Sequence, residues 1–165
     1  MALVIETGLI VPGAESFATA AELVTYAENF GRVIPADTPS QEALLRRAAL
    51  EMNAKPWKGR TVSQLQALAW PRYEVCLNKW LLPSNTIPAQ VKAGQMALAT
   101  EIHADDLAPP ELKKGAVIKE LVEGAVERQY TTAAPNIAKA AATRQSYAQF
   151  AGLLESSSQV SLRRS

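Results

Sequence analysis

Apolar residues first recur at helical spacing shortly after the start of the chain. Four of them fall at i, i+3, i+4 and i+7, on one face of a helix: Leu23, Tyr26, Ala27 and Phe30. Thr19 and Glu22 precede this face with the spacing of a capping box. Gly31 follows where a left-handed C-terminal cap is expected. The pattern predicts a helix over about residues 20–30.

A second apolar stripe follows after a short polar stretch. It has the same helical spacing: Leu45, Ala48, Ala49 and Met52. Thr38 offers a hydroxyl cap, Pro39 suits the first helical position, and Gln41 suits the third. Pro56 restricts the residues before it to extended conformations. We therefore predict a second helix over 39–54.

The longest helical pattern opens at a proline and ends before a pair of prolines. Its core-side residues are Val91, Leu98 and Ile102. Gly94 lies within this pattern and would let a neighbouring helix approach closely. Pro109 and Pro110 cannot continue a helix. We predict this third helix over 88–104.

Residues 117–130 change to β-branched residues mixed with charges around a glycine, which predicts a β-hairpin. A two-residue loop would set Glu120 opposite Glu127, and like charges directly across a ladder are destabilising. A three-residue loop at 122–124 sets Lys119 opposite Glu127 instead and suits the glycine. We therefore expect the three-residue loop.

The two ends of the chain are expected to extend from this core. The first 18 residues, with Gly8, Pro12 and Gly13, predict an extended N-terminal arm. An Ala-rich linker over 131–143 precedes a last apolar face at helical spacing: Tyr147, Phe150, Ala151 and Leu154. A helix over about 144–155 is marginal alone and must dock on something. We predict a mainly α protein, a small helical bundle with a hairpin, divided into a core (1–130) and an extension (131–165).

Trp70-Pro71-Arg72 fits no regular element. A residue before proline is pushed into an extended conformation, and proline itself donates no backbone hydrogen bond. We expect a structural anchor here, with Trp70 buried and Arg72 available to a contact between subunits. Residues 73–87 are expected to be irregular, and three of them supply apolar anchors: Trp80, Leu81 and Leu82.

Charge argues against a dedicated nucleic-acid binder, because 17 basic and 16 acidic residues give a net charge of +1. One local patch interleaves an aromatic with cations, as single-strand binders do: Lys55, Trp57, Lys58 and Arg60. Arg46 and Arg47 could extend it. The favoured alternative is a solvated basic turn with Trp57 folded onto the core.

Catalytic constellations are absent from the sequence. One histidine, His103, and one cysteine, Cys76, cannot supply four ligands to a zinc ion. There is no Gly-rich phosphate loop and no Gly-x-Ser-x-Gly turn. We expect no enzyme, no metal and no cofactor, with Cys76 as a small, partly buried residue. No apolar run reaches the roughly 18 residues of a membrane span, so we expect no membrane partner and a cytoplasmic protein.

Several blocks of the chain resemble a family of tailed-bacteriophage and prophage proteins. The resemblance covers roughly residues 3–130 in one colinear order. Its most specific block ends in Trp70-Pro71-Arg72. The others are Val4 to Gly8, Val11 to Ala14, Gly59-Arg60, Ile87-Pro88 with Val91-Lys92, and the hairpin from Val117 to Tyr130. The chain departs from the family pattern between Tyr73 and Thr86.

The resemblance implies a head-to-tail connector, or adaptor, in the virion neck. Such adaptors are mostly helical, and about twelve copies close into a homo-oligomeric ring beneath the portal. The implied partners are the portal protein, a tail-side neck protein and DNA that passes without sequence-specific binding. Some members of the family are described as DnaT-like single-stranded-DNA-binding proteins, which is the alternative function.

We expect the hairpin or the N-terminal arm to lie across an adjacent subunit, and the terminal helix and basic tail to reach the portal. The residues expected at these contacts are Val117, Lys119, Leu121, Val126, Tyr130, Tyr147, Phe150, Leu154, Arg163 and Arg164.

Overall fold

The computed structural model describes residues 3–107, 117–123, 125–130 and 144–155. It contains four helices: α1 (Ala20–Asn29), α2 (Thr38–Asn53), α3 (Ala89–Leu107) and α4 (Gln145–Phe150). Short strands form antiparallel pairs: β1 (Arg60–Thr61) with β2 (Arg72–Tyr73), β3 (Cys76–Leu77) with β4 (Trp80–Leu81), and β5 (Val117–Glu123) with β6 (Ala125–Tyr130). The mainly α prediction is confirmed. Among the described helices, none is long and apolar enough to cross a membrane.

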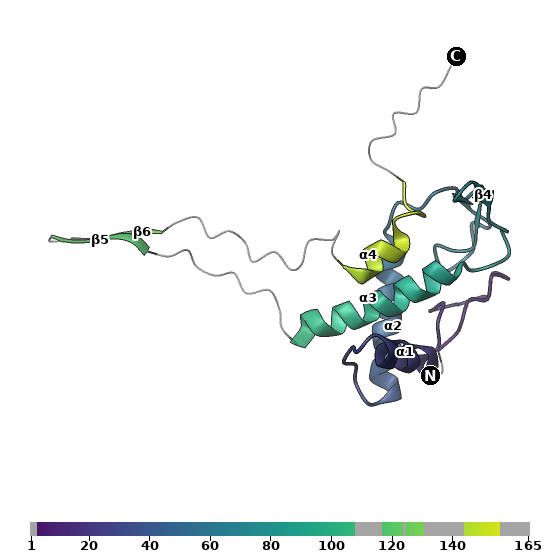
Figure 1. Ribbon diagram of the computed structural model, residues 1–165, viewed down its shortest axis with the longest axis horizontal. Helices are drawn as coiled ribbons and strands as arrows, with labels where there is room; N and C mark the ends of the chain where they lie inside the picture. Colours follow the sequence, from purple (N-terminus) through teal and green to yellow (C-terminus); the bar gives the residue numbers. More distant parts are fainter. Residues whose placement is uncertain (1–2, 108–116, 124, 131–143, 156–165) are drawn as a thin grey trace, which may run out of the picture.

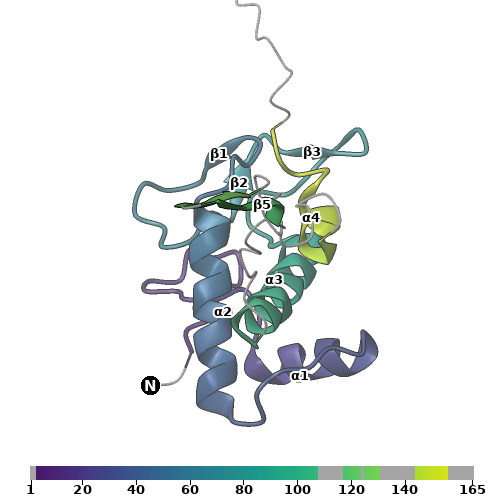
Figure 2. The ribbon, with the colours of Figure 1, turned by 90° about the vertical axis from the view of Figure 1, so that its left-hand side faces the viewer.

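The helices pack into one layered body (Figures 1 and 2). In Figure 2, α2 runs along the body, α3 crosses it, and α1 lies across one end. The loops that carry β1 to β4 cover the opposite end. α4 packs along α3, so the last described segment belongs to the same core. As predicted, this helix docks on another part of the protein, and that part belongs to its own protomer.

Helix α1 follows its sequence signals closely. The hydroxyl of Thr19 accepts the Glu22 backbone N–H at 3.2 Å, and the Glu22 carboxylate accepts the Thr19 N–H at 2.7 Å. At the other end Gly31 has a φ of +58°. The Arg32 N–H bonds the Ala27 carbonyl at 2.8 Å, which completes a Schellman cap. The capping box and the glycine cap are both confirmed.

Helix α2 begins one residue earlier than predicted, because a stronger cap is available. The carboxylate of Asp37 accepts the Ser40 backbone N–H at 2.9 Å, which makes Asp37 the N-cap. Hydrogen bonds from the Ser40 side chain and from the Ser40 backbone N–H lower the pKa of Asp37 below its usual value. A carboxylate at a helix N-terminus also faces the positive end of the helix dipole, an advantage that the hydroxyl of Thr38 lacks. The predicted buried stripe is confirmed.

Helix α3 runs three residues further than predicted, and its glycine receives α4. Gly94 is buried, and a Cβ built on it would meet the ring of Phe150. The predicted close approach at Gly94 is thus confirmed. The α4 helix itself is shorter than predicted, because its helical pattern gives way to a turn after Phe150. Phe150 and Leu153, rather than Leu154, then fill the core.

The N-terminal segment is a closed loop rather than an extended arm. The buried carboxylate of Glu6 accepts three backbone N–H groups, those of Gly8, Ile10 and Val11, at 2.7, 3.1 and 2.9 Å. The loop returns so that Glu6 N–H bonds the Ser16 carbonyl at 2.8 Å. The N-terminal segment therefore leaves little free chain for the expected contact with a neighbouring subunit.

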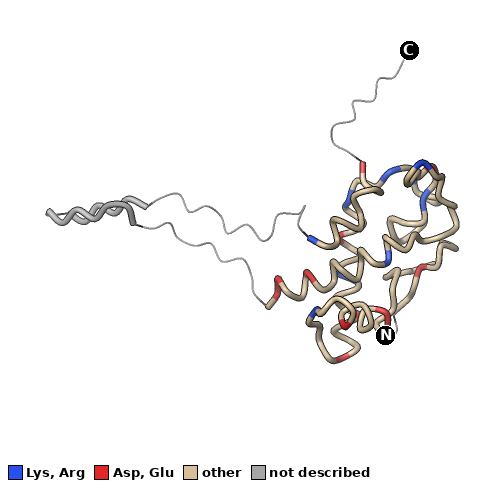
Figure 3. The backbone as a smooth tube through the Cα atoms, viewed as in Figure 1, with Lys and Arg blue, Asp and Glu red and all other residues tan. Residues whose placement is uncertain are grey.

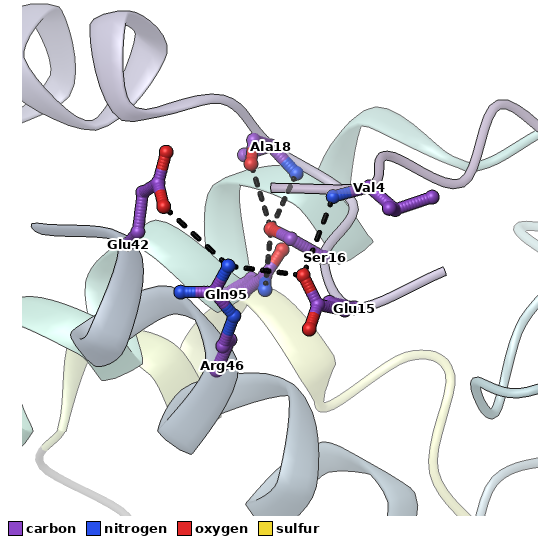
Figure 4. A network of polar contacts seen from close by, with 7 residues as sticks. All are labelled: Val4, Glu15, Ser16, Ala18, Glu42, Arg46 and Gln95. Carbon is purple, nitrogen blue, oxygen red and sulfur yellow. Dashed lines mark hydrogen bonds and ion pairs between the residues drawn. The ribbon is translucent and has the colours of Figure 1, made fainter. Parts of the chain in front are cut away.

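A buried amide fixes this loop to the helices (Figure 4). The side chain of Gln95 on α3 accepts the Phe17 N–H and donates to the Ser16 hydroxyl and the Leu45 carbonyl, each at 2.9 Å. Nearby, Arg46 pairs with Glu15 at 3.0 Å and with Glu42 at 3.4 Å. A fully satisfied amide in an apolar core specifies one arrangement of its partners. These contacts join the N-terminal loop, α2 and α3.

The start of α4 is held by polar contacts with α3. The Glu101 carboxylate accepts the Ser146 N–H at 3.0 Å and its hydroxyl at 2.6 Å. Arg144 pairs with Asp105 at 3.1 Å. The residues that leave α3 and those that enter α4 are therefore fastened together, on either side of the segment that contains β5 and β6.

The hairpin at 117–130 is confirmed, and its predicted register is wrong. The ladder sets Glu120 opposite Arg128 and ends at Glu123 opposite Ala125, with an irregularity near Val117. This register sets Glu120 opposite a basic residue, which neither of the two loops considered from the sequence would do. The expected conformation of the glycine at 124 lies outside the described residues. β5 and β6 contact each other and no other described helix or strand.

Candidate nucleic-acid interface

The Trp70-Pro71-Arg72 corner lies inside the molecule. Trp70 is 1% exposed, its peptide bond to Pro71 is cis, and its ring meets the ring of Trp57 edge to face at 5.8 Å. The Arg72 guanidinium donates to four backbone carbonyls at 2.8–3.3 Å: those of Trp57, Lys58, Gly59 and Ala69. Burial lowers the pKa of Arg72. This corner fastens the β1–β2 loops to the core, and Arg72 makes these hydrogen bonds within the protomer, whereas the buried indole N–H of Trp70 has no partner in the described part of the chain.

The basic patch predicted around Trp57 is not a stacking platform. Trp57 is 3% exposed and its indole N–H donates to the Met52 carbonyl at 2.7 Å. The ammonium group of Lys55 lies 5.7 Å from the centre of the Phe150 ring. Lys58 donates to the Gly152 carbonyl at 2.9 Å. The favoured interpretation, with Trp57 folded onto the core, is confirmed.

Strands β3 and β4 form a small hairpin where an irregular segment was predicted. Asn78 and Lys79 have φ values of +50° and +71°, as a two-residue turn of type I′ requires. Trp80 and Leu81 follow and are 78% and 67% exposed. We call residues 78–81 the β3–β4 tip. Cys76 at its base is exposed as well, contrary to expectation.

The expected burial of Trp80 and Leu81 is wrong for a geometric reason. The Leu82 N–H bonds the Val75 carbonyl at 2.8 Å, and Leu82 packs against the core. The chain reverses immediately beyond this bond, so the tip projects past the last residues that the core can cover. The signal that could have found it is Asn78, a residue that tolerates the left-handed conformation, between two apolar pairs.

A second aromatic–cation pair lies at the same end of the molecule. The Arg60 guanidinium is 6.0 Å from the centre of the Tyr73 ring, and Tyr73 is 42% exposed. Arg60 also pairs with Glu74 at 3.3 Å, with both side chains about 70% exposed. Such a solvated ion pair contributes little and exchanges readily for another anion. Together with Lys79 and Trp80, this pair offers two rings and two cations to solvent.

Charge is distributed unevenly over the body (Figure 3). Several basic segments lie at the end that carries β4, whereas acidic residues gather on α1 and on the C-terminal half of α3. The acidic set consists of Glu22, Glu28, Glu101, Asp105 and Asp106. An anionic partner would therefore be favoured at the β3–β4 end.

The other predicted contact residues are dispersed. Tyr147 is 43% exposed, Leu154 is partly buried against the core, and Phe150 is 1% exposed. Phe150 fills the notch at Gly94 and so is not available to a partner. The remaining ones lie in β5 and β6, namely Val117, Lys119, Leu121, Val126 and Tyr130, or outside the described residues, namely Arg163 and Arg164.

Comparison with protein families gives a match over residues 1–165 to the family described as "Putative DnaT-like ssDNA binding protein". The chain belongs to this DnaT-like family. No curated protein matches it, and no solved structure does. The family agrees with the alternative function considered from the sequence. In this DnaT-like chain, Trp80 and Tyr73 are exposed aromatic side chains that each lie beside a cation.

Proposed function

We propose that this chain binds single-stranded DNA through the β3–β4 tip and the adjacent Arg60–Tyr73 pair. The observation that carries the proposal is the exposure of Trp80, at 78%, directly beside Lys79. Membership of the DnaT-like family supports it. Unpaired bases present their flat faces to such a ring, and a base stacked on an aromatic contributes about 1–3 kcal/mol.

The charges favour modest affinity with a modest salt dependence. Arg60 and Lys79 can each neutralise one phosphate, and each such contact on a single strand lowers the logarithmic salt slope by about 0.7. A slope near −1.4 is then expected from these two cations. The near-neutral whole chain adds no large field of its own. Duplex DNA, whose bases are stacked already, should bind more weakly than a single strand.

Fluorescence anisotropy of a labelled thymine oligonucleotide tests the proposal. Trp80→Ala should weaken binding roughly 5- to 150-fold, the affinity equivalent of losing one stacked base. Tyr73→Ala should weaken it as well. Tyr147→Ala is the matched control, because Tyr147 is about as exposed as Tyr73 but lies on α4. Equal affinities for all four proteins, or no binding by the wild type, would overturn the proposal.

A specific observation favours a second function, a ring-forming connector in a phage neck. The β5–β6 hairpin contacts no other described element of its protomer. A lone two-stranded hairpin is at best marginally stable in water, so it needs a surface to pack on. A neighbouring subunit in a ring of about twelve copies would supply one, between the portal and a tail-side protein. DNA would then pass through the channel of the virion neck.

The test is electron microscopy of the chain mixed with the portal protein of the phage that encodes it. The wild type should form rings on the portal. A variant with residues 117–130 replaced by a Gly-Ser linker should remain folded and form none. A truncation test must spare α4, because Phe150 and Leu153 belong to the core. Rings that persist without the hairpin would contradict this second function.

A further inference from the structure

A pocket lies between α1 and α3. Its volume is about 380 Å³, and it is lined by Ala21, Glu22, Thr25, Tyr26, Asn29 and Met96. Tyr26 is 6% exposed, and its hydroxyl has no hydrogen-bond partner in the part of the chain that the structure describes. Burial raises the pKa of this phenol, so Tyr26 stays neutral. The pocket thus has an apolar floor and a polar rim.

The β3–β4 tip offers an occupant for this pocket. Trp80 is a large ring that projects from a tight turn, and it is 78% exposed. Its indole N–H needs an acceptor when it is buried. The pocket residues offer the second carboxylate oxygen of Glu22, whose other oxygen caps α1, and the amide oxygen of Asn29. The tip and α1 lie at opposite ends of the body, so Trp80 cannot fill the pocket of its own protomer (Figures 1 and 2).

Charge supports the same pairing. Lys79 precedes Trp80 at the tip, while α1 contains Glu22 and Glu28 and neither Lys nor Arg. Two cations lie nearby, Lys92 one turn from Met96 on α3 and Arg32 beyond the end of α1, so the attraction for Lys79 comes from Glu22 and Glu28. Complementary potentials of this kind fix orientation and speed encounter.

We infer that Trp80 of one copy inserts into the α1–α3 pocket of a second copy, with Lys79 beside Glu22. Because the knob and the pocket lie on different faces, the contact is heterologous and propagates into a ring or a filament. The inference does not depend on DNA binding, although both use Trp80. A single strand in excess should therefore dissociate the assembly.

Two variants separate the halves of the contact. Trp80→Ala removes the knob and leaves the pocket intact. Thr25→Trp fills the pocket from an exposed position on α1 and leaves the knob intact. Each variant should raise the dissociation constant (Kd) of self-association by roughly thirtyfold or more, as loss of a tryptophan anchor commonly does. Tyr147→Ala, at an exposed site outside both halves, should associate like the wild type.

Sedimentation velocity of the full chain over a wide concentration range is the measurement. The wild type should form oligomers, each variant alone should remain monomeric, and their equimolar mixture should form dimers that grow no further. A monomeric wild type, a monomeric mixture, or variants that assemble like the wild type would each overturn the inference. Circular dichroism establishes that the variants are folded.

The same variants distinguish this inference from the proposed DNA binding. Tyr73→Ala should weaken binding of the thymine oligonucleotide and leave assembly unchanged. Thr25→Trp should abolish assembly and leave oligonucleotide binding unchanged. Assembly without any DNA binding would refute the proposed function alone, and DNA binding by a strictly monomeric wild type would refute the inference alone.

Discussion

Gly94 lies against the ring of Phe150. We predict that the added methyl group of Gly94→Ala lowers the free energy of unfolding. A Cβ on Gly94 would lie 2.6 and 2.7 Å from two atoms of the Phe150 ring and closer still to a third. Ordinary contacts between carbon atoms are about 3.5–4.0 Å. Phe150 is 1% exposed and its ring meets that of Trp57 edge to face at 5.1 Å. The ring therefore has nowhere to move without breaking that pair.

The expected cost of Gly94→Ala follows from three terms. Overpacking costs about 1–3 kcal/mol. Disturbing the aromatic pair with Trp57 costs about 0.5–1.5 kcal/mol. Replacing glycine by alanine inside a helix returns about 1 kcal/mol. We expect a net loss of about 0.5–3.5 kcal/mol in the free energy of unfolding.

A double-mutant cycle isolates the contact. Urea denaturation is followed for the wild type, Gly94→Ala, Phe150→Leu and the double variant. Once the ring is gone, the helix-propensity gain should dominate, and Gly94→Ala should be neutral or stabilising by up to about 1 kcal/mol. If Gly94→Ala costs the same in both backgrounds, or stabilises the wild type, the packing of α4 into this notch is refuted.

Substitutions at three further positions test the scaffold. Arg72→Met should lower the free energy of unfolding by about 2–3 kcal/mol in urea denaturation, because it leaves backbone carbonyls without donors. Arg72→Lys should recover less than half of that loss, since lysine lacks the planar, multi-donor guanidinium group of arginine. Asp37→Ala should cost about 1 kcal/mol and lower Tm, whereas Asp37→Asn should retain most of the cap. Asp106→Asn should destabilise the protein at neutral pH, because its hydrogen bond with Arg47 lowers the pKa of Asp106. The stabilisation by Asp106 is present above its unfolded pKa of about 3.9 and is lost as pH falls through its folded pKa. The difference in denaturation midpoint between the wild type and Asp106→Asn should therefore close in acid.

The sequence predicted the features that depend on neighbours along the chain. Thr19, Glu22 and Gly31 define α1 through contacts within a few residues, and such rules are local. Gly94 was identified as a place of close approach because an internal helical glycine needs a packing reason. The partner in that notch, Phe150, was assigned instead to an outward contact, because helical spacing identifies an apolar face and not what covers it.

Features that depend on long-range contacts or on competing caps were missed. The closure of the N-terminal loop requires Gln95, which is 79 positions from Ser16 and carries no sequence signal of that role. The choice of Asp37 over Thr38 rests on the helix dipole, which favours the carboxylate over the hydroxyl of the adjacent residue. The exposure of Trp80 was missed because a large apolar residue is normally assigned to the core. That expectation fails where a tight turn carries the chain beyond the core.

Tryptophan fluorescence tests the proposed function most directly, because the three tryptophans differ in exposure. Trp57 and Trp70 are buried, and Trp80 is exposed. Titration with a thymine oligonucleotide should quench the solvent-exposed emission of the wild type, and the quenching should disappear in Trp80→Phe while the buried emission is unchanged. Binding detected by anisotropy without any quenching of Trp80, or the same quenching in Trp80→Phe, would contradict the account.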